Sequence, residues 1–299
     1  MRAQRAATRT LSQFLGMYEK PLFPWPDLSN VTYVLGLMSL TGATTHEFLQ
    51  RESVSDAFAR DIVQSATRAN YGQNIDEIHA LEGMVCLITD GAKSIAGGNW
   101  QIFQKFLHSS GAEVRLESGV STIKLGLKGW LVDGESFDFV VMAAPFHSTG
   151  IQAPIEVEEP EYVRIHVTLF TTTAPLSEVY FGQSPPDVIL TTKQDMIESP
   201  PFNSISLLRI MKNGQYLYKV FSPKEFDPRI LDASPTWVYR HVWNAYPRLF
   251  PHVSFERIEL APGFFYTSGM ESLISTMETN ALMGKNIAAL IHRRLGEGK

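Results

Sequence analysis

The amino-acid sequence predicts a mixed α/β (α+β) fold. Two distant segments, residues 91–148 and 255–299, each combine a helical pattern with short strands, which is typical of an α/β layer. Residues 149–254 instead contain strands of alternating polarity, as in a half-exposed antiparallel sheet. Residues 1–90 are rich in helical patterns. We therefore expect an α/β layer assembled from discontinuous segments, and a second domain that combines helices with an antiparallel sheet.

The helical patterns of the first section are interrupted at defined places. Apolar side chains at helical spacing predict a helix over residues 11–18, which the following prolines end, and one or two more helices over residues 45–69. The only cysteine, Cys86, lies in an apolar run, so the sequence predicts a buried thiol and excludes an intrachain disulfide.

The first α/β segment begins at Gly97-Gly98-Asn99, a turn that opens a predicted helix over residues 100–108. Strands are expected after this helix, at residues 113–116, 120–125, 130–132 and 137–144. The apolar run 139–144 has no polar alternation, so we expect it to be buried on both faces.

The middle region carries the antiparallel patterns. Residues 162–172 alternate strictly, and Asn213-Gly214 predicts a hairpin between strands at 204–211 and 216–221. A helix is expected over residues 235–246.

The C-terminal segment predicts a cofactor site. A strand over residues 256–260 and an aromatic stretch lead to Gly269 and a predicted helix over 272–295. A strand that ends at a glycine and restarts as a helix directs free N–H groups at an anion or an electron-rich carbonyl. The plain alternative is a core helix with Met277, Leu282 and Ile287 facing inward.

Composition and motifs exclude several classes of function. The chain has 26 basic and 31 acidic residues and no basic cluster, so nucleic acid is not an expected partner. No apolar stretch approaches the roughly 20 residues that span a bilayer. No metal-ligand spacing occurs, and His166 and His241 lack partners at catalytic spacing, so no catalytic side chain is assigned. No Gly-x-Gly-x-x-Gly motif occurs, so the pyrophosphate grip of a dinucleotide enzyme is missing from this sequence.

Four short motifs, in order, resemble the prenylcysteine oxidase (prenylcysteine lyase) family of flavin-dependent thioether oxidases. They are Arg68-Ala69-Asn70-Tyr71-Gly72-Gln73, Gly97-Gly98-Asn99, Trp243-Asn244-Ala245-Tyr246-Pro247, and a C-terminal set of Phe265-Tyr266, Gly269-Met270-Glu271 and Thr276-Met277-Glu278. The resemblance covers about residues 45–295. It implies the fold of flavin amine oxidases, in which a Rossmann-like FAD-binding layer of separate segments carries an inserted substrate domain. Family members begin with a glycine-rich βαβ unit, which this sequence lacks.

The resemblance also implies roles for individual residues. Gly269 and Glu271 would lie beside the ribityl and pyrophosphate part of FAD, and the backbone at Thr276 and Met277 would face the flavin pyrimidine. Three further candidates for cofactor contact are Gly97, Gly98 and, for adenine, the backbone of Val120. The substrate pocket would take Asn70, Tyr71, Gln73, Trp243 and Tyr246. A polar helix end explains residues 70–73 equally, and core packing explains the two aromatic residues.

The reaction that the resemblance implies is hydride transfer from a farnesyl- or geranylgeranyl-cysteine to FAD, which yields cysteine, a prenyl aldehyde and, with O₂, hydrogen peroxide. Such chemistry belongs to the breakdown of prenylated proteins in lysosomes or vacuoles. Two alternatives stay open: a truncated, non-catalytic module that binds an apolar ligand or a protein, and a related flavin amine oxidase or desaturase. Because the glycine-rich unit is missing, a partner chain or an N-terminal segment would complete the FAD site, and apolar surface is expected to be exposed without it.

Overall fold

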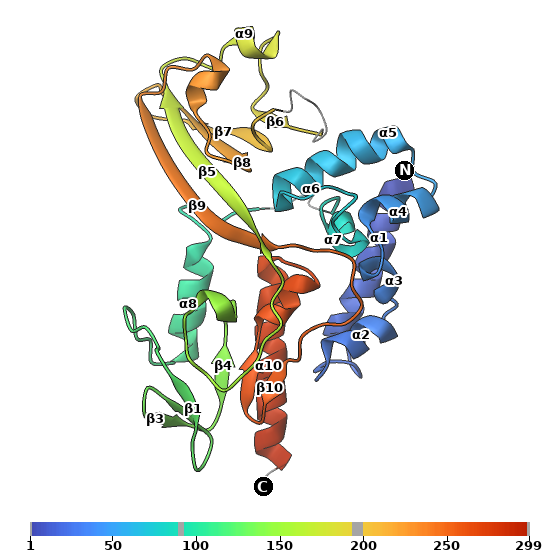
Figure 1. The fold of residues 1–299 in the computed structure, drawn as a ribbon, viewed down its shortest axis with the longest axis vertical. Coiled ribbons are helices and arrows are strands. Elements are labelled where there is room, and N and C mark those ends of the chain that lie inside the picture. Colours follow the sequence, from blue (N-terminus) through green and yellow to red (C-terminus); the bar gives the residue numbers. More distant parts are fainter. Residues whose placement is uncertain (1, 89–92, 193–199, 298–299) are drawn as a thin grey trace.

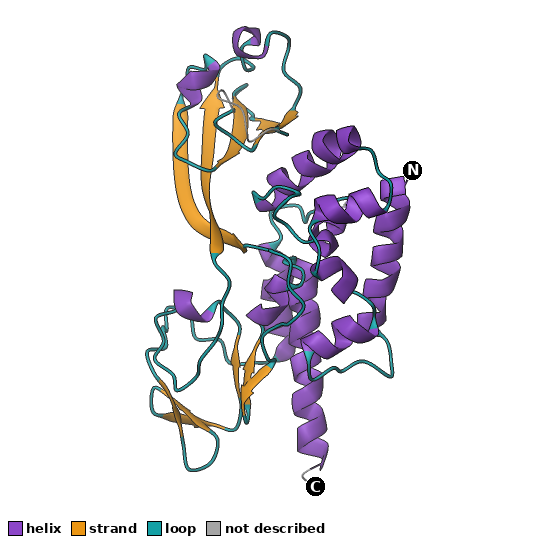
Figure 2. Cartoon of the chain, turned by 45° about the vertical axis from the view of Figure 1, so that its right-hand side comes forward, coloured by secondary structure: helices purple, strands orange, loops and turns teal. Residues whose placement is uncertain are grey.

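The computed structural model describes residues 2–88, 93–192 and 200–297. The helices of residues 2–85 gather on one side, the five-stranded sheet stands at the upper left in Figure 1, and the two small sheets lie at the bottom (Figures 1 and 2). The predicted mixed α/β fold is confirmed. The division into domains stays a prediction.

The N-terminal section is helical, as predicted. Its elements are α1 (Arg2–Leu15), η1 (Gly16–Tyr18), α2 (Leu28–Val34), α3 (Met38–Thr41), α4 (Thr45–Arg51), α5 (Asp56–Phe58), η2 (Ala59–Val63), α6 (Gln64–Tyr71) and α7 (Ala80–Val85). All of them except α5 and α6 share one apolar core with the long C-terminal helix α10 (Met277–Glu297). The side-chain amide of Asn286 in α10 also donates to the Trp25 carbonyl at 2.8 Å and accepts from the Trp25 N–H at 2.9 Å. Cys86 is buried, as predicted.

The five-stranded sheet is antiparallel, with the order β6-β7-β8-β5-β9. Its strands are β5 (Tyr162–Thr172), β6 (Val188–Leu190), β7 (Ser204–Ile210), β8 (Tyr216–Ser222) and β9 (Trp237–Pro247). The predicted hairpin at Asn213-Gly214 is confirmed, and the φ of +82° at Gly214 needs a glycine. The predicted strand at 162–172 is also confirmed, and it buries Val163 and Ile165 near its start but Thr168 and Phe170 on the opposite face near its end.

The predicted helix over residues 235–246 is wrong, because this segment is strand β9. Its aromatic and β-branched side chains suit a strand, and β5 supplies a long pairing partner from Tyr162 to Thr171. The strand carries a bulge near its end: Arg164 pairs with Asn244 and Val163 with Tyr246, so one residue is extra. Tertiary pairing therefore overrides the local helical pattern.

The α/β layer is assembled from distant segments, as predicted. Strand β4 (Val140–Met142) runs parallel to β11 (Phe264–Tyr266), and β10 (Glu259–Ala261) pairs with β11 in the antiparallel sense. Helix α8 (Trp100–Ser110) precedes a separate antiparallel sheet of β1 (Ile123–Leu125), β2 (Trp130–Val132) and β3 (Glu135–Phe137). The remaining short helices are η3 (Phe146–Ser148), α9 (Glu178–Phe181), η4 (Pro228–Leu231) and η5 (Ser268–Ser272).

Four details of the predicted layer are wrong. Residues 113–116 form no strand: Arg115 contacts β3 through its ion pair with Glu135, and the segment has no backbone pairing with a described strand. The run 139–144 is a strand only over β4, and Val141 is 44% exposed, so the run is not buried on both faces. The strand expected over 256–260 is instead β10, and the C-terminal helix begins at Met277 rather than at 272, because η5 occupies the first part of that stretch.

Candidate functional site

The candidate site surrounds the start of α10. Two threonines close the turn before this helix: the Thr276 hydroxyl accepts from the Thr279 N–H at 3.1 Å, and the Thr279 hydroxyl donates to the Ile274 carbonyl at 2.7 Å. Within the described part of the chain, the N–H groups of Met277 and Glu278 have no acceptor, and Met277 is 48% exposed. The helix therefore presents an open, partially positive end.

The glycine turn before α8 reaches this helix end. Asn99 Nδ2 lies 3.9 Å from the Met277 sulfur, although 178 residues separate the two in the sequence. Gly97 and Gly98 have φ values of +87° and +118°, which other residues rarely adopt. The structure thus brings the predicted residues Gly97, Gly98, Thr276 and Met277 to one place.

The other predicted cofactor residues are more dispersed. Gly269 and Glu271 lie in η5, shortly before α10, and Glu271 Oε2 accepts from the Tyr162 hydroxyl of β5 at 3.0 Å. Burial raises the pKa of the Glu271 carboxyl. Val120, in contrast, precedes β1 and lies near Asp133 and Phe137, away from the α10 turn.

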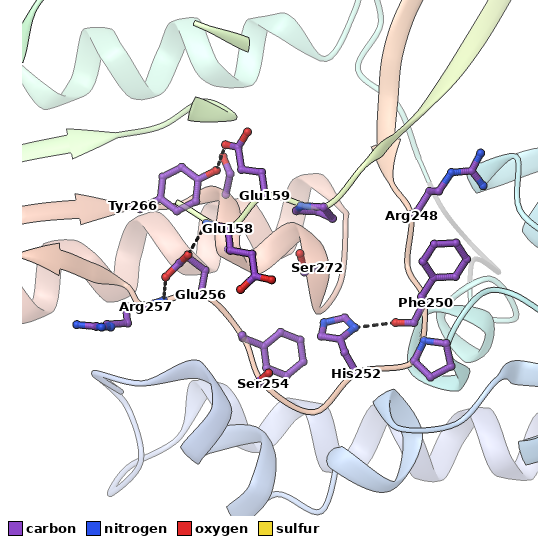
Figure 3. A pocket seen from close by; sticks show the side chains of 15 residues that line it. Glu158, Glu159, Arg248, Phe250, His252, Ser254, Glu256, Arg257, Tyr266 and Ser272 are labelled. Atoms are coloured by element: carbon purple, nitrogen blue, oxygen red, sulfur yellow. Dashed lines mark hydrogen bonds between the residues drawn. The ribbon is translucent and has the colours of Figure 1, made fainter. Parts of the chain in front are cut away.

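A polar pocket of about 460 Å³ opens beside η5 and includes Gly269 in its wall. Figure 3 shows Glu158, Glu159 and Glu256 gathered near Tyr266, with Arg248 on the opposite side. Glu159 accepts hydrogen bonds from the Tyr266 hydroxyl and from the backbone N–H groups of residues 146 and 147. The sequence offered no signal for this pocket, because its side chains come from segments around residues 158–160, 248–257 and 266–272 that only the fold brings together.

An aromatic group forms the wall next to the α10 turn. The ring centroids of Tyr71 and Tyr246 lie 5.1 Å apart, and those of Tyr246 and Trp243 lie 6.4 Å apart. The bulge in β9 places Tyr246 on the same face as Trp243, because Val163 and Ile165 pair with these two residues. The Tyr71 hydroxyl donates to the Ser275 carbonyl at 3.3 Å. Three of the predicted substrate residues are therefore in contact.

Asn70 and Gln73, the other predicted substrate residues, serve the backbone. The buried Gln73 amide donates to the Pro247 carbonyl at 3.1 Å and accepts from the Leu249 N–H at 2.8 Å, which fixes the end of β9. The exposed Asn70 donates to the Ala66 carbonyl at 3.0 Å. These contacts match the polar-junction interpretation of residues 70–73.

Two buried titratable groups, which the sequence analysis missed, hold the segment before α10. His79 Nδ1 accepts from the Glu82 N–H at 3.3 Å, so its Nε2–H donates to the Ser272 carbonyl at 3.2 Å. Burial lowers the pKa of His79 to about 3, and burial raises the pKa of Glu82 to about 7. Glu82 Oε2 accepts from the Ser275 N–H at 3.0 Å. From sequence alone, both residues look like ordinary helix-start residues.

Among the described residues, no three metal-ligating side chains are grouped so as to hold a metal ion. No helix in that part of the chain is long and apolar enough to cross a membrane.

Solved amine oxidases share this fold. A putrescine oxidase aligns with a TM-score of 0.60 at 12% identity, over 98% of this chain and 75% of that one. Cyclohexylamine oxidase from Brevibacterium oxydans aligns with a TM-score of 0.56 at 12% identity, over 87% of this chain and 69% of that one.

Proteins related in sequence identify the family more specifically than the fold does. The chain is 31% identical to farnesylcysteine lyase of Arabidopsis thaliana, over 95% of this chain and 60% of that protein. It is 24% identical to human prenylcysteine oxidase 1, over 93% of this chain and 63% of that protein. The chain thus spans about 60% of the length of these relatives. The model of the prenylcysteine lyase family matches residues 1–299, and the chain belongs to that family.

Proposed function

We propose that this chain forms the substrate-facing and flavin-facing parts of an FAD-dependent oxidoreductase that cleaves the thioether of farnesyl- or geranylgeranyl-cysteine. One observation carries the proposal: Asn99 of the glycine turn contacts Met277 at the open end of α10, and Tyr71, which packs with Tyr246 and Trp243, donates to Ser275 just before it. Membership of the prenylcysteine lyase family supports the same reaction.

The residues at the start of α10 fit the pyrimidine end of a flavin. A carbonyl oxygen of that ring would find two N–H donors, at Met277 and Glu278, that have no acceptor among the described residues. Gly97 and Gly98 leave room for close backbone approach. When bound, FAD supplies the hydride acceptor. The partial positive charge at the helix end stabilises negative charge on a neighbouring ring.

The remaining cofactor contacts that we propose lie outside the start of α10. Gly269 and Glu271 would lie along the ribityl and pyrophosphate part, and Val120 would contact adenine through its backbone. A pyrophosphate grip is not found in this sequence. We infer that an additional segment or a partner chain supplies it and covers the apolar face of α8, whose Trp100, Phe103 and Phe106 are 45–60% exposed.

An aromatic sheet face offers a place for the prenyl chain. Trp237, Tyr239 and Trp243 occupy alternate positions of β9, so they share one face, and each is nearly half exposed. The Trp237 and Tyr239 rings stack at 6.3 Å, and the apolar Leu169 lies opposite Tyr239 on β5. Rigid rings that remain accessible can bury a long isoprenoid at little entropic cost.

The proposed products are cysteine, a prenyl aldehyde and, with O₂ as electron acceptor, hydrogen peroxide. The proposed setting is the breakdown of prenylated proteins in a lysosome or vacuole. The second candidate is a non-catalytic module that binds an apolar ligand, and the exposed aromatic face of β9 favours it.

Titration of the purified chain with FAD, followed by peroxide release on adding farnesylcysteine, tests the proposal. We expect wild type to quench flavin fluorescence through the contacts at the start of α10, and to release peroxide once the segment or partner that supplies the pyrophosphate grip is added. Trp243→Ala is expected to weaken farnesylcysteine binding about tenfold, since a large aromatic contact is lost. Tyr33→Ala, at an exposed position of α2, is the matched control. Farnesylcysteine binding without FAD binding would favour the apolar-ligand module, and oxidation of amines alone would favour an amine oxidase.

A further inference from the structure

The segment that joins η5 to α10 is held by side chains from a different part of the chain. His79 donates to the Ser272 carbonyl at 3.2 Å, Glu82 accepts from the Ser275 N–H at 3.0 Å, and Tyr71 donates to the Ser275 carbonyl at 3.3 Å. The N–H and the carbonyl of Ser275 belong to successive peptide units. Both peptide planes next to Ser275 are therefore fixed, one residue before the Thr276 that caps α10.

Glu82 performs this role at a cost to stability. Its side chain is fully buried, and in the described part of the chain Oε1 receives no hydrogen bond. A buried carboxyl with an unsatisfied oxygen is destabilising compared with an apolar residue of similar size. Packing alone therefore does not explain a glutamate here, whereas a requirement for an acceptor beneath the helix start does.

We propose that Glu82 is a positioning residue: through Ser275 it sets the direction of the free N–H groups at the start of α10. The inference rests on the proposed function, because those N–H groups are the ones offered to a flavin. Glu82 acts through the backbone and does not itself touch the cofactor.

The charge of Glu82 modulates the same helix end. An ionised carboxyl behind α10 opposes its partial positive charge, whereas a neutral carboxyl leaves it undiminished. The titratable side chains around Glu82 are Tyr71, Cys86 and Tyr246, with His79 and His252 on the side of Ser272. Burial raises the pKa of Cys86 and lowers that of both histidines, so all three are neutral near pH 7 and Glu82 is the group that changes charge there.

Two substitutions of Glu82 separate the effect of its hydrogen-bond acceptor from the effect of its charge. Glu82→Gln keeps an oxygen for the Ser275 N–H and removes the charge, whereas Glu82→Leu removes both. Glu77→Gln is the matched control, because Glu77 lies in the same segment and accepts only from the Asn74 N–H in the described structure. Tyr71→Phe removes the donor to the Ser275 carbonyl and keeps the ring.

Hydrogen exchange of the amides of residues 275–278, measured on the chain without flavin, is the first readout. We expect Glu82→Leu to accelerate exchange of the Ser275 amide about tenfold or more, and Glu82→Gln and Glu77→Gln to leave it near wild type. Tyr71→Phe is expected to give an intermediate acceleration, and it substitutes for Glu82→Leu if that variant does not fold. Wild-type exchange in Glu82→Leu, or in Tyr71→Phe where it is the substitute, would overturn the proposal.

FAD affinity as a function of pH is the second readout. We expect Glu82→Leu to bind FAD about tenfold more weakly, and Glu82→Gln to lose the weakening that wild type shows as pH rises through about 7. Equal FAD affinity and equal pH dependence in all variants would overturn the role of Glu82 toward the cofactor. If wild type itself binds no FAD while exchange in Glu82→Leu is faster, the proposed function fails but the positioning of the α10 turn by Glu82 is supported.

Discussion

Helices α7 and α8 show how two helices of one chain that carry large apolar side chains can differ in their packing. In α7, Leu81 and Met84 are fully buried in the core that the N-terminal helices share with α10. In α8, none of the residues is buried, and its aromatic side chains face outward. Both helices contain large apolar side chains, so the difference lies in whether neighbouring elements cover them.

Helices α7 and α8 also contribute differently to the proposed site. The packed helix α7 supplies Glu82 to the turn before α10, and the uncovered helix α8 begins at the glycine turn that approaches the same place. The proposed flavin end thus lies between the packed helix α7 and the exposed apolar face of α8. Such an arrangement fits a site that another segment or a partner chain completes.

Acid titration of His79, which precedes the packed helix α7, is expected to give the largest change in the free energy of unfolding. Its pKa is about 3 in the folded protein against 6.5 in an unfolded chain, so the unfolded state takes up the proton first. The stability that neutral His79 contributes is present above pH 6.5 and is lost as pH falls towards 3, by about 5 kcal/mol. Urea denaturation across this range measures the loss. His79→Gln is expected to lack this component, and His108→Gln on α8 is expected to behave as wild type.

Truncation of one leucine in each helix compares the two directly. Leu81→Ala in α7 removes a fully buried side chain and is expected to cost about 2–5 kcal/mol. Leu107→Ala in α8 changes a side chain that is 49% exposed and is expected to cost less than about 0.5 kcal/mol. Chemical denaturation of both variants gives the difference. Equal losses would mean that α8 is packed in solution, through self-association or otherwise.

Ionisation of Glu82 is expected to change the stability of the fold with pH in the opposite direction to that of His79. Its pKa is about 7 in the folded protein and 4.5 in an unfolded chain, so ionisation is disfavoured by folding. Stability is fully present below pH 4.5 and falls by about 3 kcal/mol as pH rises through about 7. Between pH 4.5 and about 7, the contributions of Glu82 and His79 to the free energy of unfolding partly cancel. Thermal unfolding of Glu82→Gln is therefore expected to show a steeper gain in stability from acid to neutral pH than wild type, and an unchanged slope would contradict the burial of this carboxyl.

Local signals in the sequence predicted part of this architecture and of the site. The turns at Asn213-Gly214 and Gly97-Gly98 were predicted correctly, because one or two residues determine the backbone conformation there. The segment of Trp243 fails as a predicted helix because its partner, β5, lies far away in the sequence. The functional setting of His79 and Glu82 could not be predicted, because nothing in a helix-start pattern says which distant carbonyl or N–H group the side chain will meet.

Phe106→Asp on α8 has the smallest expected effect on stability and addresses the uncovered surface. Because Phe106 is 60% exposed, a charge there leaves the fold unchanged and is expected to shift the unfolding free energy by less than about 0.5 kcal/mol. The same charge disrupts an apolar patch, so self-association at micromolar concentration is expected to fall. Sedimentation velocity of the two proteins measures this, with Tyr33→Asp as a control for added charge at another exposed aromatic residue. A large loss of stability in Phe106→Asp would show that α8 is covered within the monomer, and identical association in all three proteins would place the contact surface elsewhere, so that the contrast between α7 and α8 would no longer explain how the site is completed.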